Sequence, residues 1–246
     1  MLEALPDDFT AVVTGAGGGI GRAVLDHLLA SDRPGRVLAV SRHPIEHRDP
    51  RLEALTLDLS RQAGRETLAG RLDGAPVHLL FNAIGLLHDT ARGMQPEKRL
   101  EELDADTLAY LFQVNATTPA LLLQALHASL KGRHPAIVAS LSARVGSIDD
   151  NRLGGWYGYR ASKAAHNMLM RTAAIELARY NRRSLVLCLH PGTTDTALSR
   201  PFQSRVPEGR LFTPAFVAER LFAVINARRP EDTGTFWDWA GQPIAW

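Results

Sequence analysis

Two residues in the second half of the chain are spaced so that they could carry out proton chemistry. Tyr159 and Lys163 lie in a run that continues into helix formers with apolar residues three and four positions apart. On a helix, residues four apart point from the same face on successive turns. An ammonium beside a phenol favours the phenolate and lowers a pKa that is otherwise about 10. We therefore predict an acid/base pair usable near neutral pH.

The same spacing has a simpler interpretation, a packed ring beside a solvated charge. Tyr157 is a second tyrosine in this run, but no basic residue follows it four positions later. The pair becomes catalytic only next to a cofactor that needs a proton partner, so the elements that would position such a cofactor decide between the two interpretations.

The composition is that of an ordinary globular protein. The chain has 246 residues, of which 45% are hydrophobic and 22% charged, enough for one large α/β domain or two small ones. The formal net charge of +2 gives no argument for a nucleic-acid or membrane partner. The sequence start does not resemble a secretory signal, and no apolar stretch reaches about 18 residues. We expect a cytoplasmic protein.

A single cysteine, Cys188, excludes an internal disulfide framework and is typical of a reducing compartment. Because it lies in an apolar run, we expect a buried structural thiol and not a nucleophile.

The sequence near the start predicts a dinucleotide-binding turn. A short buried strand over Thr10–Thr14 is followed by glycines at Gly15, Gly19 and Gly21 and then by an amphipathic stretch. Strand, glycine turn and helix is the arrangement in which backbone N–H groups receive a phosphate. No Gly-Lys-Ser/Thr closes the turn, which argues against a Walker loop, and the spacing differs from G-x-G-x-x-G.

The residues after the second predicted strand, Arg36–Val40, indicate which dinucleotide binds. An NAD site carries a carboxylate here, whereas this chain has Ser41 and Arg42. A guanidinium can grip a 2′-phosphate with paired hydrogen bonds. We therefore predict NADP(H) over NAD(H), with His43 or Arg48 as neighbours that could share the role. The simpler alternative is a surface arginine.

Strands and helices alternate along the whole chain, without a linker or a fixed repeat. This predicts one α/β, Rossmann-like doubly wound domain over residues 1–246, with about seven parallel strands and helices on both faces. Further strands are expected over Leu52–Leu57, Val77–Phe81, Ala136–Leu141, Ser184–Leu189 and Gly234–Trp239, and helices from a cap at Ser60 to Leu72, over Ala105–Leu130, and over Pro214–Ala227.

Polar and turn-forming residues follow several of these strands, where a ligand of such a sheet would bind. Asn115 lies in an apolar helical run and must have its amide paired. Pro119 predicts a kink in the same helix. The segment Ser199–Phe212 is polar and is predicted to form a mobile lid over the ligand.

Together these residues resemble the short-chain dehydrogenase/reductase family, in its single-domain branch, from about Thr10 to Thr196. The resemblance rests on the order and spacing of the glycine turn, Asp58, Asn82-Ala-x-Gly85, Asn115, a serine near 142, Tyr159-x-x-x-Lys163 and Pro191-Gly192. The cofactor-binding residues that it implies are Gly15, Gly19, Ile20, Gly21, Ser41, Arg42, Asp58, Leu59, Asn82, Ala83, Gly85, Tyr159, Lys163, Pro191, Gly192, Thr194 and Thr196.

The resemblance also implies the chemistry. Tyr159 would be the acid/base, Lys163 the ribose anchor that tunes its pKa, Ser142 the hydrogen-bond partner of the substrate oxygen, and Asn115 the holder of a water in the proton relay. The implied activity is NADPH-dependent reduction of a small-molecule carbonyl, or oxidation of the alcohol, by a homodimer or homotetramer without a metal.

The match departs from the family pattern at the catalytic serine. Counting back from Gly146 puts that serine at Ala143, whereas counting along the strand favours Ser142, with Ser140 as its rival. The run Leu141–Ile148 and the C-terminal Asp238–Trp246 are similar to the C-factor and sniffer-like carbonyl reductases. The alternative from another class is a dinucleotide-binding regulatory or signalling protein, since fold does not fix activity.

Overall fold

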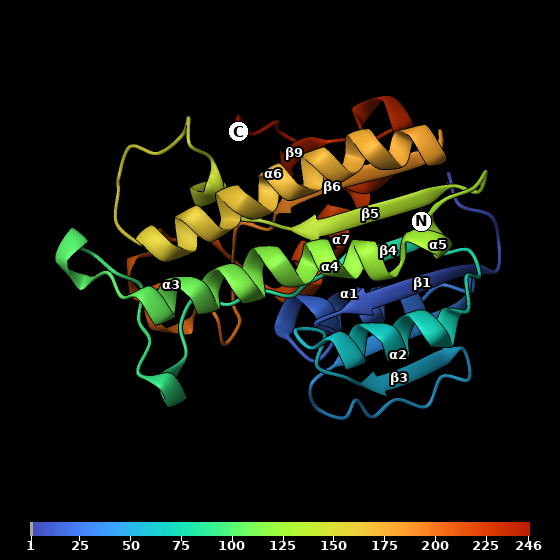
Figure 1. Cartoon of the computed structure of the whole chain (residues 1–246), viewed down its shortest axis with the longest axis horizontal. Coiled ribbons are helices and arrows are strands. Elements are labelled where there is room, and N and C mark those ends of the chain that lie inside the picture. Colours follow the sequence, from blue (N-terminus) through green and yellow to red (C-terminus); the bar gives the residue numbers. More distant parts are fainter. Residues whose placement is uncertain (1) are drawn as a thin grey trace.

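A single parallel sheet organises the chain, whose computed structural model describes residues 2–246. The sheet order is β3-β2-β1-β4-β5-β6-β9, and every neighbouring pair is parallel (Figure 1). The strands are β1 (Phe9–Thr14), β2 (Pro34–Ser41), β3 (Leu52–Thr56), β4 (Leu79–Asn82), β5 (Ala136–Leu141), β6 (Ser184–His190) and β9 (Thr235–Asp238). Strand order reverses between β1 and β4, which is where ligands bind in sheets of this kind.

Helices cover both faces of this sheet, as predicted. On one face lie α1 (Gly19–Leu29) and α7 (Pro214–Asn226), and on the other lie α2 (Gln62–Leu72), α4 (Thr118–Ala125) and α6 (Tyr157–Tyr180) (Figure 1). Successive residues of a strand point to opposite faces. Ala11 and Val13 of β1 therefore belong to one hydrophobic core and Val12 to the other.

The long helix predicted over Ala105–Leu130 is helical almost throughout, but it is interrupted just before Pro119, where a kink was predicted, and again at Leu126. The segment folds as α3 (Ala105–Phe112), a π-helical turn (Gln113–Thr117), α4 and a short α5 (His127–Leu130). Pro119 lies in the first turn of α4, where its missing N–H is tolerated, and the backbone widens before it: the N–H of Thr118 donates to the carbonyl of Gln113.

The predicted helix cap at Ser60 was wrong. Helix α2 begins at Gln62 after Arg61, without a side-chain cap. The Ser60 hydroxyl instead donates to the Asp58 carboxylate at 2.6 Å, and the Ser60 backbone N–H donates to the same oxygen. Because the helix begins later than predicted, Ser60 lies one residue before the N-cap position, and its hydroxyl oxygen does not cap the helix.

The other boundaries lie within two residues of the predictions. The segment predicted as a lid contains short regular elements. It contains a 3₁₀ turn (Arg200–Arg205) and β8 (Leu211–Phe212), which pairs with β7 (Thr193–Thr194) after β6. Across residues 2–246, no helix combines the length and the apolar character needed to cross a bilayer.

Candidate functional site

A cavity of about 590 Å³ opens at the carboxyl ends of β1, β2 and β4. Seven of the predicted cofactor-binding residues line it, namely Gly15, Ser41, Arg42, Asp58, Leu59, Ala83 and Gly85. They come from segments far apart in the sequence, and the parallel sheet brings them to one edge. The structure therefore gathers these seven predicted residues around one cavity.

The glycine turn is packed so tightly that its glycines are required. Gly15 adopts a φ of 70°, in the region that favours glycine, and a Cβ there would lie 2.9 Å from the backbone of Ala83. A Cβ on Gly21 would overlap the Gly15 carbonyl. These close approaches let the start of α1 face the cavity with its free N–H groups, which suits a phosphate.

The loop after β6 meets this turn from the other side. A Cβ on Gly19 would lie 2.6 Å from Cγ2 of Thr196, so the two predicted residues are in close contact. Thr194 is buried, and its hydroxyl oxygen has no hydrogen-bond partner within residues 2–246. Gly192, with a φ of 73°, turns the chain after Pro191 against Phe212. The side chain of Ile20 instead packs against the hydrophobic core.

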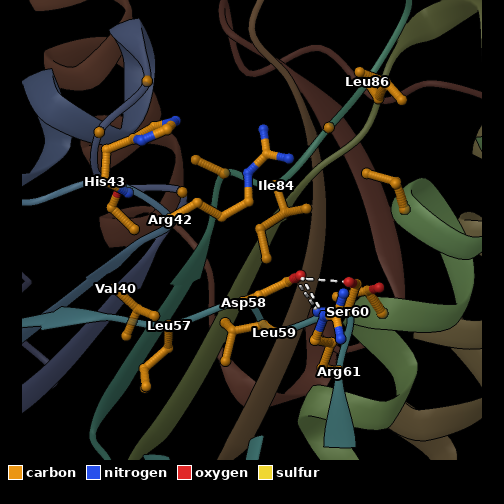
Figure 2. A pocket seen from close by; sticks show the side chains of 18 of the residues that line it. Val40, Arg42, His43, Leu57, Asp58, Leu59, Ser60, Arg61, Ile84 and Leu86 are labelled. Atoms are coloured by element: carbon orange, nitrogen blue, oxygen red, sulfur yellow. Dashed lines mark hydrogen bonds and ion pairs between the residues drawn. The ribbon is translucent and has the colours of Figure 1, made fainter. Parts of the chain in front are cut away.

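Charged side chains line the end of the cavity near β2 and β3. Figure 2 shows Arg42 and His43 after β2, and Asp58, Ser60 and Arg61 together after β3. The hydrogen bond from the Ser60 hydroxyl is the main cause that holds the pKa of Asp58 below its usual value. Arg61 pairs with Asp58 at 3.4 Å and is mostly exposed, with 81% of its side chain accessible.

Sequence reasoning missed Arg61, Arg92 and Tyr110, which also line the cavity. The guanidinium of Arg92 stacks over the Tyr110 ring at 4.3 Å. Arg61 directly follows the Asp58 motif and could have been found from it. Arg92 lies in a short 3₁₀ turn (Thr90–Arg92) and Tyr110 lies on α3, and no local sequence pattern identifies either of them as a site residue.

A row of polar side chains crosses the sheet just below this edge. Register aligns Thr14, Asn82 and Ser140 on adjacent strands. Thr14 donates to Oδ1 of Asn82, and Nδ2 of Asn82 donates to Ser140, each at 2.8 Å. The Asn82 amide is thus used inside the sheet and does not reach the cavity, whereas Ala83 and Gly85 do. Asn82 positions the strand ends instead.

Lys163 lies at the same edge, between β4 and β5. Its Nζ donates to the Leu141 carbonyl at 3.0 Å, and a Cβ on Gly85 would lie 3.5 Å from that nitrogen. Burial lowers the pKa of Lys163 to about 8, and the electrostatic interaction with Cys188 acts in the opposite direction. The lysine is therefore next to the cavity, and it loses its proton more easily than an exposed lysine does.

Tyr159 lies one turn earlier on α6, as the spacing predicted. Lys163 Nζ is 6.0 Å from its ring centroid, and the hydroxyl has no hydrogen-bond partner within residues 2–246. Burial raises the pKa of Tyr159 above its usual value. This is opposite to the predicted direction, because the lysine donates to Leu141 and desolvation of the phenolate dominates.

Asn115 connects the π-helical turn to the loop after β4. Its Oδ1 accepts from the Leu86 N–H at 2.7 Å, and its Nδ2 donates to the Leu86 carbonyl at 2.8 Å and to Ser162 at 3.0 Å. The prediction that this buried amide must be paired is confirmed. It clamps the backbone beside Gly85, and a π-helical turn often marks a functional position.

The Ser142 hydroxyl is hydrogen-bonded within the protein. Its hydroxyl donates to Oδ1 of Asn167 on α6 at 2.6 Å, and the Asn167 amide donates to the Gly146 carbonyl at 3.4 Å. Ser140 accepts from Asn82. Neither serine hydrogen-bonds to Tyr159, so the identity of the catalytic serine stays a prediction.

Aromatic rings pack beside Tyr159, and one of them, Phe202, comes from the predicted lid. The Trp156 and Tyr159 rings meet edge-on, with their centroids 6.2 Å apart. The centroids of the Trp156 and Phe202 rings are 5.2 Å apart. His88 packs against Phe202 at 5.8 Å. Trp156 has a φ of 53°, which a non-glycine residue adopts only under strain, and such strain is typical of functional sites.

Comparison with known proteins points to one family. The sequence pattern of the short chain dehydrogenase family matches residues 9–206. A 1-hydroxy-2-glutathionyl-2-methyl-3-butene dehydrogenase of Rhodococcus sp. is 31% identical over 77% of this chain and 78% of the relative. The C-signal protein of Myxococcus xanthus is 32% identical over 60% of this chain and 83% of its own. The NADPH-bound carbonyl reductase from chicken fatty liver superposes with a TM-score of 0.85 at 26% identity, covering 100% of this chain and 96% of that one.

Proposed function

The chain belongs to the short-chain dehydrogenase/reductase family, and on this basis we propose that it is an NADP(H)-dependent oxidoreductase acting on a small-molecule carbonyl or the corresponding alcohol. One observation carries the proposal. Lys163, one helical turn from Tyr159, places its ammonium between Leu141 and Gly85 at the edge of the dinucleotide cavity. If Tyr159 were only a packed ring and Lys163 only a solvated charge, the lysine would not be buried at this edge.

The residues fit a dinucleotide. The tight glycine turn suits a pyrophosphate, and the unpartnered Thr194 hydroxyl offers a hydrogen bond to a ligand group. Arg42 supports the preference for NADP(H), because its guanidinium borders the cavity after β2, where a carboxylate would repel a 2′-phosphate. The NADPH in the chicken carbonyl reductase agrees with this preference.

In the proposed reaction, a nicotinamide cofactor held by these residues would supply the hydride that the carbonyl carbon accepts. Tyr159 donates its proton to the oxygen as negative charge develops there, and the reverse reaction returns the proton. Lys163 holds the ribose and stabilises the phenolate that remains. The raised pKa of Tyr159 keeps the phenol protonated before reaction, which is the state that a proton donor needs.

Tyr159 is only 7% exposed, and the rings of Trp156, which packs against it, and of Phe202, which packs against Trp156, would help to exclude water from this step. Because Phe202 lies in the segment Ser199–Phe212, we propose that this segment opens to admit substrate.

NADPH oxidation across aldehydes, ketones and quinones tests the proposal, with Tyr159→Phe as the variant. We expect the variant to lose about 100-fold to 10,000-fold in kcat, the usual contribution of a general acid. Its NADPH dissociation constant should stay within about threefold. Tyr157→Phe is the matched control, because Tyr157 is partly exposed two residues earlier on the same helix. Equal turnover in the two variants would remove Tyr159 from the mechanism.

A second candidate function follows from the state of Ser142. Its hydroxyl is tied to Asn167, and the neighbouring Ala143 has no hydroxyl, so the site as it stands aims no serine at a substrate oxygen. This favours a dinucleotide-binding regulatory protein with little turnover, and the relative from Myxococcus xanthus is named C-signal. Tight NADPH binding without turnover on any carbonyl would support this candidate.

We also propose a cytoplasmic location and a homodimer or homotetramer. The buried single thiol, Cys188, supports the first. The exposed apolar residues Met168 and Ile175 on α6 support a partner on that helix.

A further inference from the structure

Glu97 is a buried carboxylate that contacts the start of the helix that carries Tyr159. The residue lies in the loop between β4 and α3 and is only 4% exposed. Its Oε2 accepts the N–H of Gly158 at 3.2 Å, and its Oε1 has no hydrogen-bond partner within residues 2–246. Glutamate is among the residues that proteins bury least often, and a buried charge costs free energy unless it is paired. The position of Glu97 therefore needs an explanation beyond packing.

Helix α6 lacks the groups that usually cap the start of a helix. Its N-cap residue, Trp156, makes no side-chain cap, and its first turn contains no acidic residue. The first N–H groups of a helix have no acceptor within that helix, and its N-terminal end attracts negative charge. Glu97 supplies both an acceptor and a negative charge, from a position 61 residues away in the sequence.

The residues around this carboxylate leave no space for a side chain at Gly158. A Cβ there would lie 2.7 Å from Oε1 of Glu97 and 2.8 Å from a methyl carbon of Leu111 on α3. A glycine therefore lets the carboxylate reach the first turn of α6 while α3 packs against it. The backbone carbonyl of Glu97 also accepts the N–H of Trp156, the residue with a φ of 53°. Glu97 thus holds the chain at two points just before Tyr159.

We propose that Glu97 is a positioning residue that acts through the first turn of α6 and fixes the phenol of Tyr159 at the substrate carbonyl. Tyr159 directly follows Gly158, and its ring meets the Trp156 ring edge-on, so both points that Glu97 holds border the tyrosine. A proton donor must lie within hydrogen-bond reach of the oxygen that it protonates. A misplacement of about 1 Å can lower a rate about 100-fold. The inference rests on the proposed function, in which Tyr159 is the proton donor.

Two substitutions of similar size separate the hydrogen bond from packing. Glu97→Met fills the same space without a strong acceptor, whereas Glu97→Gln keeps an acceptor oxygen for the Gly158 N–H. Asp104→Ala is the matched control. Its carboxylate caps α3, which also packs against α6, by accepting the N–H of Thr107 at 2.8 Å.

The position of Tyr159 can be followed by NMR without turnover. The chain has four tyrosines, so a ring ¹³C label in tyrosine gives few signals, and those lost in Tyr159→Phe belong to Tyr159. In the cofactor-free protein, Glu97→Met should shift these signals, because the ring moves relative to Trp156. Glu97→Gln and Asp104→Ala should leave them in place, and the signals of Tyr180, at the opposite end of α6, should not move in any variant. Unchanged Tyr159 signals in Glu97→Met would overturn the inference.

Kinetics provide the second measurement. Glu97→Met should lower kcat about 10-fold to 100-fold, with the NADPH dissociation constant within about threefold of the wild type. Glu97→Gln should recover most of the loss, and Asp104→Ala should keep kcat within about twofold of the wild type. Equal kcat values in Glu97→Met and Asp104→Ala would overturn the inference, because Glu97 would then be a helix cap alone. Absence of turnover in the wild type would instead contradict the proposed function, and the NMR comparison would still decide the role of Glu97.

Discussion

At the scale of single residues, the most informative group is Lys163. Its lowered pKa follows from burial, and burial results from its place between the ends of β4 and β5. Keeping a charge there costs stability, which proteins accept at functional positions. The same environment lets the lysine exchange its proton near neutral pH. Stability and function therefore oppose each other at this residue.

Replacement of Lys163 by methionine should abolish activity and stabilise the fold. The folded-state pKa of about 8 lies below the usual 10.5, so below pH 8 both states bind the proton and the folded state bears the full cost. That cost is about 3 kcal/mol, and after loss of the Leu141 hydrogen bond we expect a net gain of about 2 kcal/mol at pH 7.

The pH dependence of the stability difference between the two proteins tests the sign of this effect. Between pH 8 and 10.5 the unfolded state binds more protons than the folded state, so the free energy of unfolding of the wild type rises there relative to Lys163→Met. Urea unfolding of both proteins at pH 7 and pH 10 measures this difference. A variant less stable than the wild type at pH 7 would show that Lys163 is not a costly charge.

At the scale of elements, the glycine turn and α1 show how local packing creates a binding site. The start of α1 lies against the Gly15 carbonyl, and only a residue without a Cβ allows that approach at Gly21. Any shift of the helix would move its free N–H groups away from the cavity. The turn therefore fixes the strand-to-helix connection and, under the proposed function, the position of a cofactor phosphate.

Two glycine-to-alanine substitutions in helices should have opposite effects on the free energy of unfolding. Gly21→Ala should lower the free energy of unfolding by about 2 kcal/mol and weaken NADPH binding, because the Gly15 carbonyl must move. Gly70→Ala is the control, since no atom lies within 4 Å of a Cβ there, and it should raise stability by about 0.5–1 kcal/mol. Thermal unfolding and NADPH titration measure both effects. A change of the same sign in both variants would mean that the close approach at Gly21 is unimportant.

At the scale of the whole molecule, one sheet joins both cores. Alternate residues of β1 contribute to opposite faces, so the two cores share this strand. The cavity lies where strand order reverses, at the carboxyl ends of strands from both halves of the sheet. Cofactor binding should therefore stabilise the whole chain and not only the loops around the cavity.

We expect one thermal transition, which NADPH shifts upward more than NADH does. A ligand at 100 times its dissociation constant adds about 2.7 kcal/mol to the folded state. Arg42→Ala should reduce the NADPH shift to that of NADH, because it removes the guanidinium expected to bind the 2′-phosphate. Arg48→Ala, outside the cavity lining, should leave the difference intact. Equal losses for both cofactors in Arg42→Ala would contradict the NADP(H) preference.

The sequence by itself determined the alternation of strands and helices, the glycine turn, and the placing of Tyr159 and Lys163 on one helix face. These features depend on residues close in the chain, because periodicity, glycine conformation and helix spacing are local properties. Asn115 was also identifiable, since an amide in an apolar run must find a partner.

Only the tertiary structure decided the partners and the protonation of these groups. The raised pKa of Tyr159, the bond from Ser142 to Asn167 and the contact of Glu97 with the start of α6 all depend on segments that are distant in sequence. Burial and hydrogen bonding are set by what folds against a residue, and no local pattern contains that information. The same reason explains why Arg92 and Tyr110 were missed, although they lie on the cavity wall.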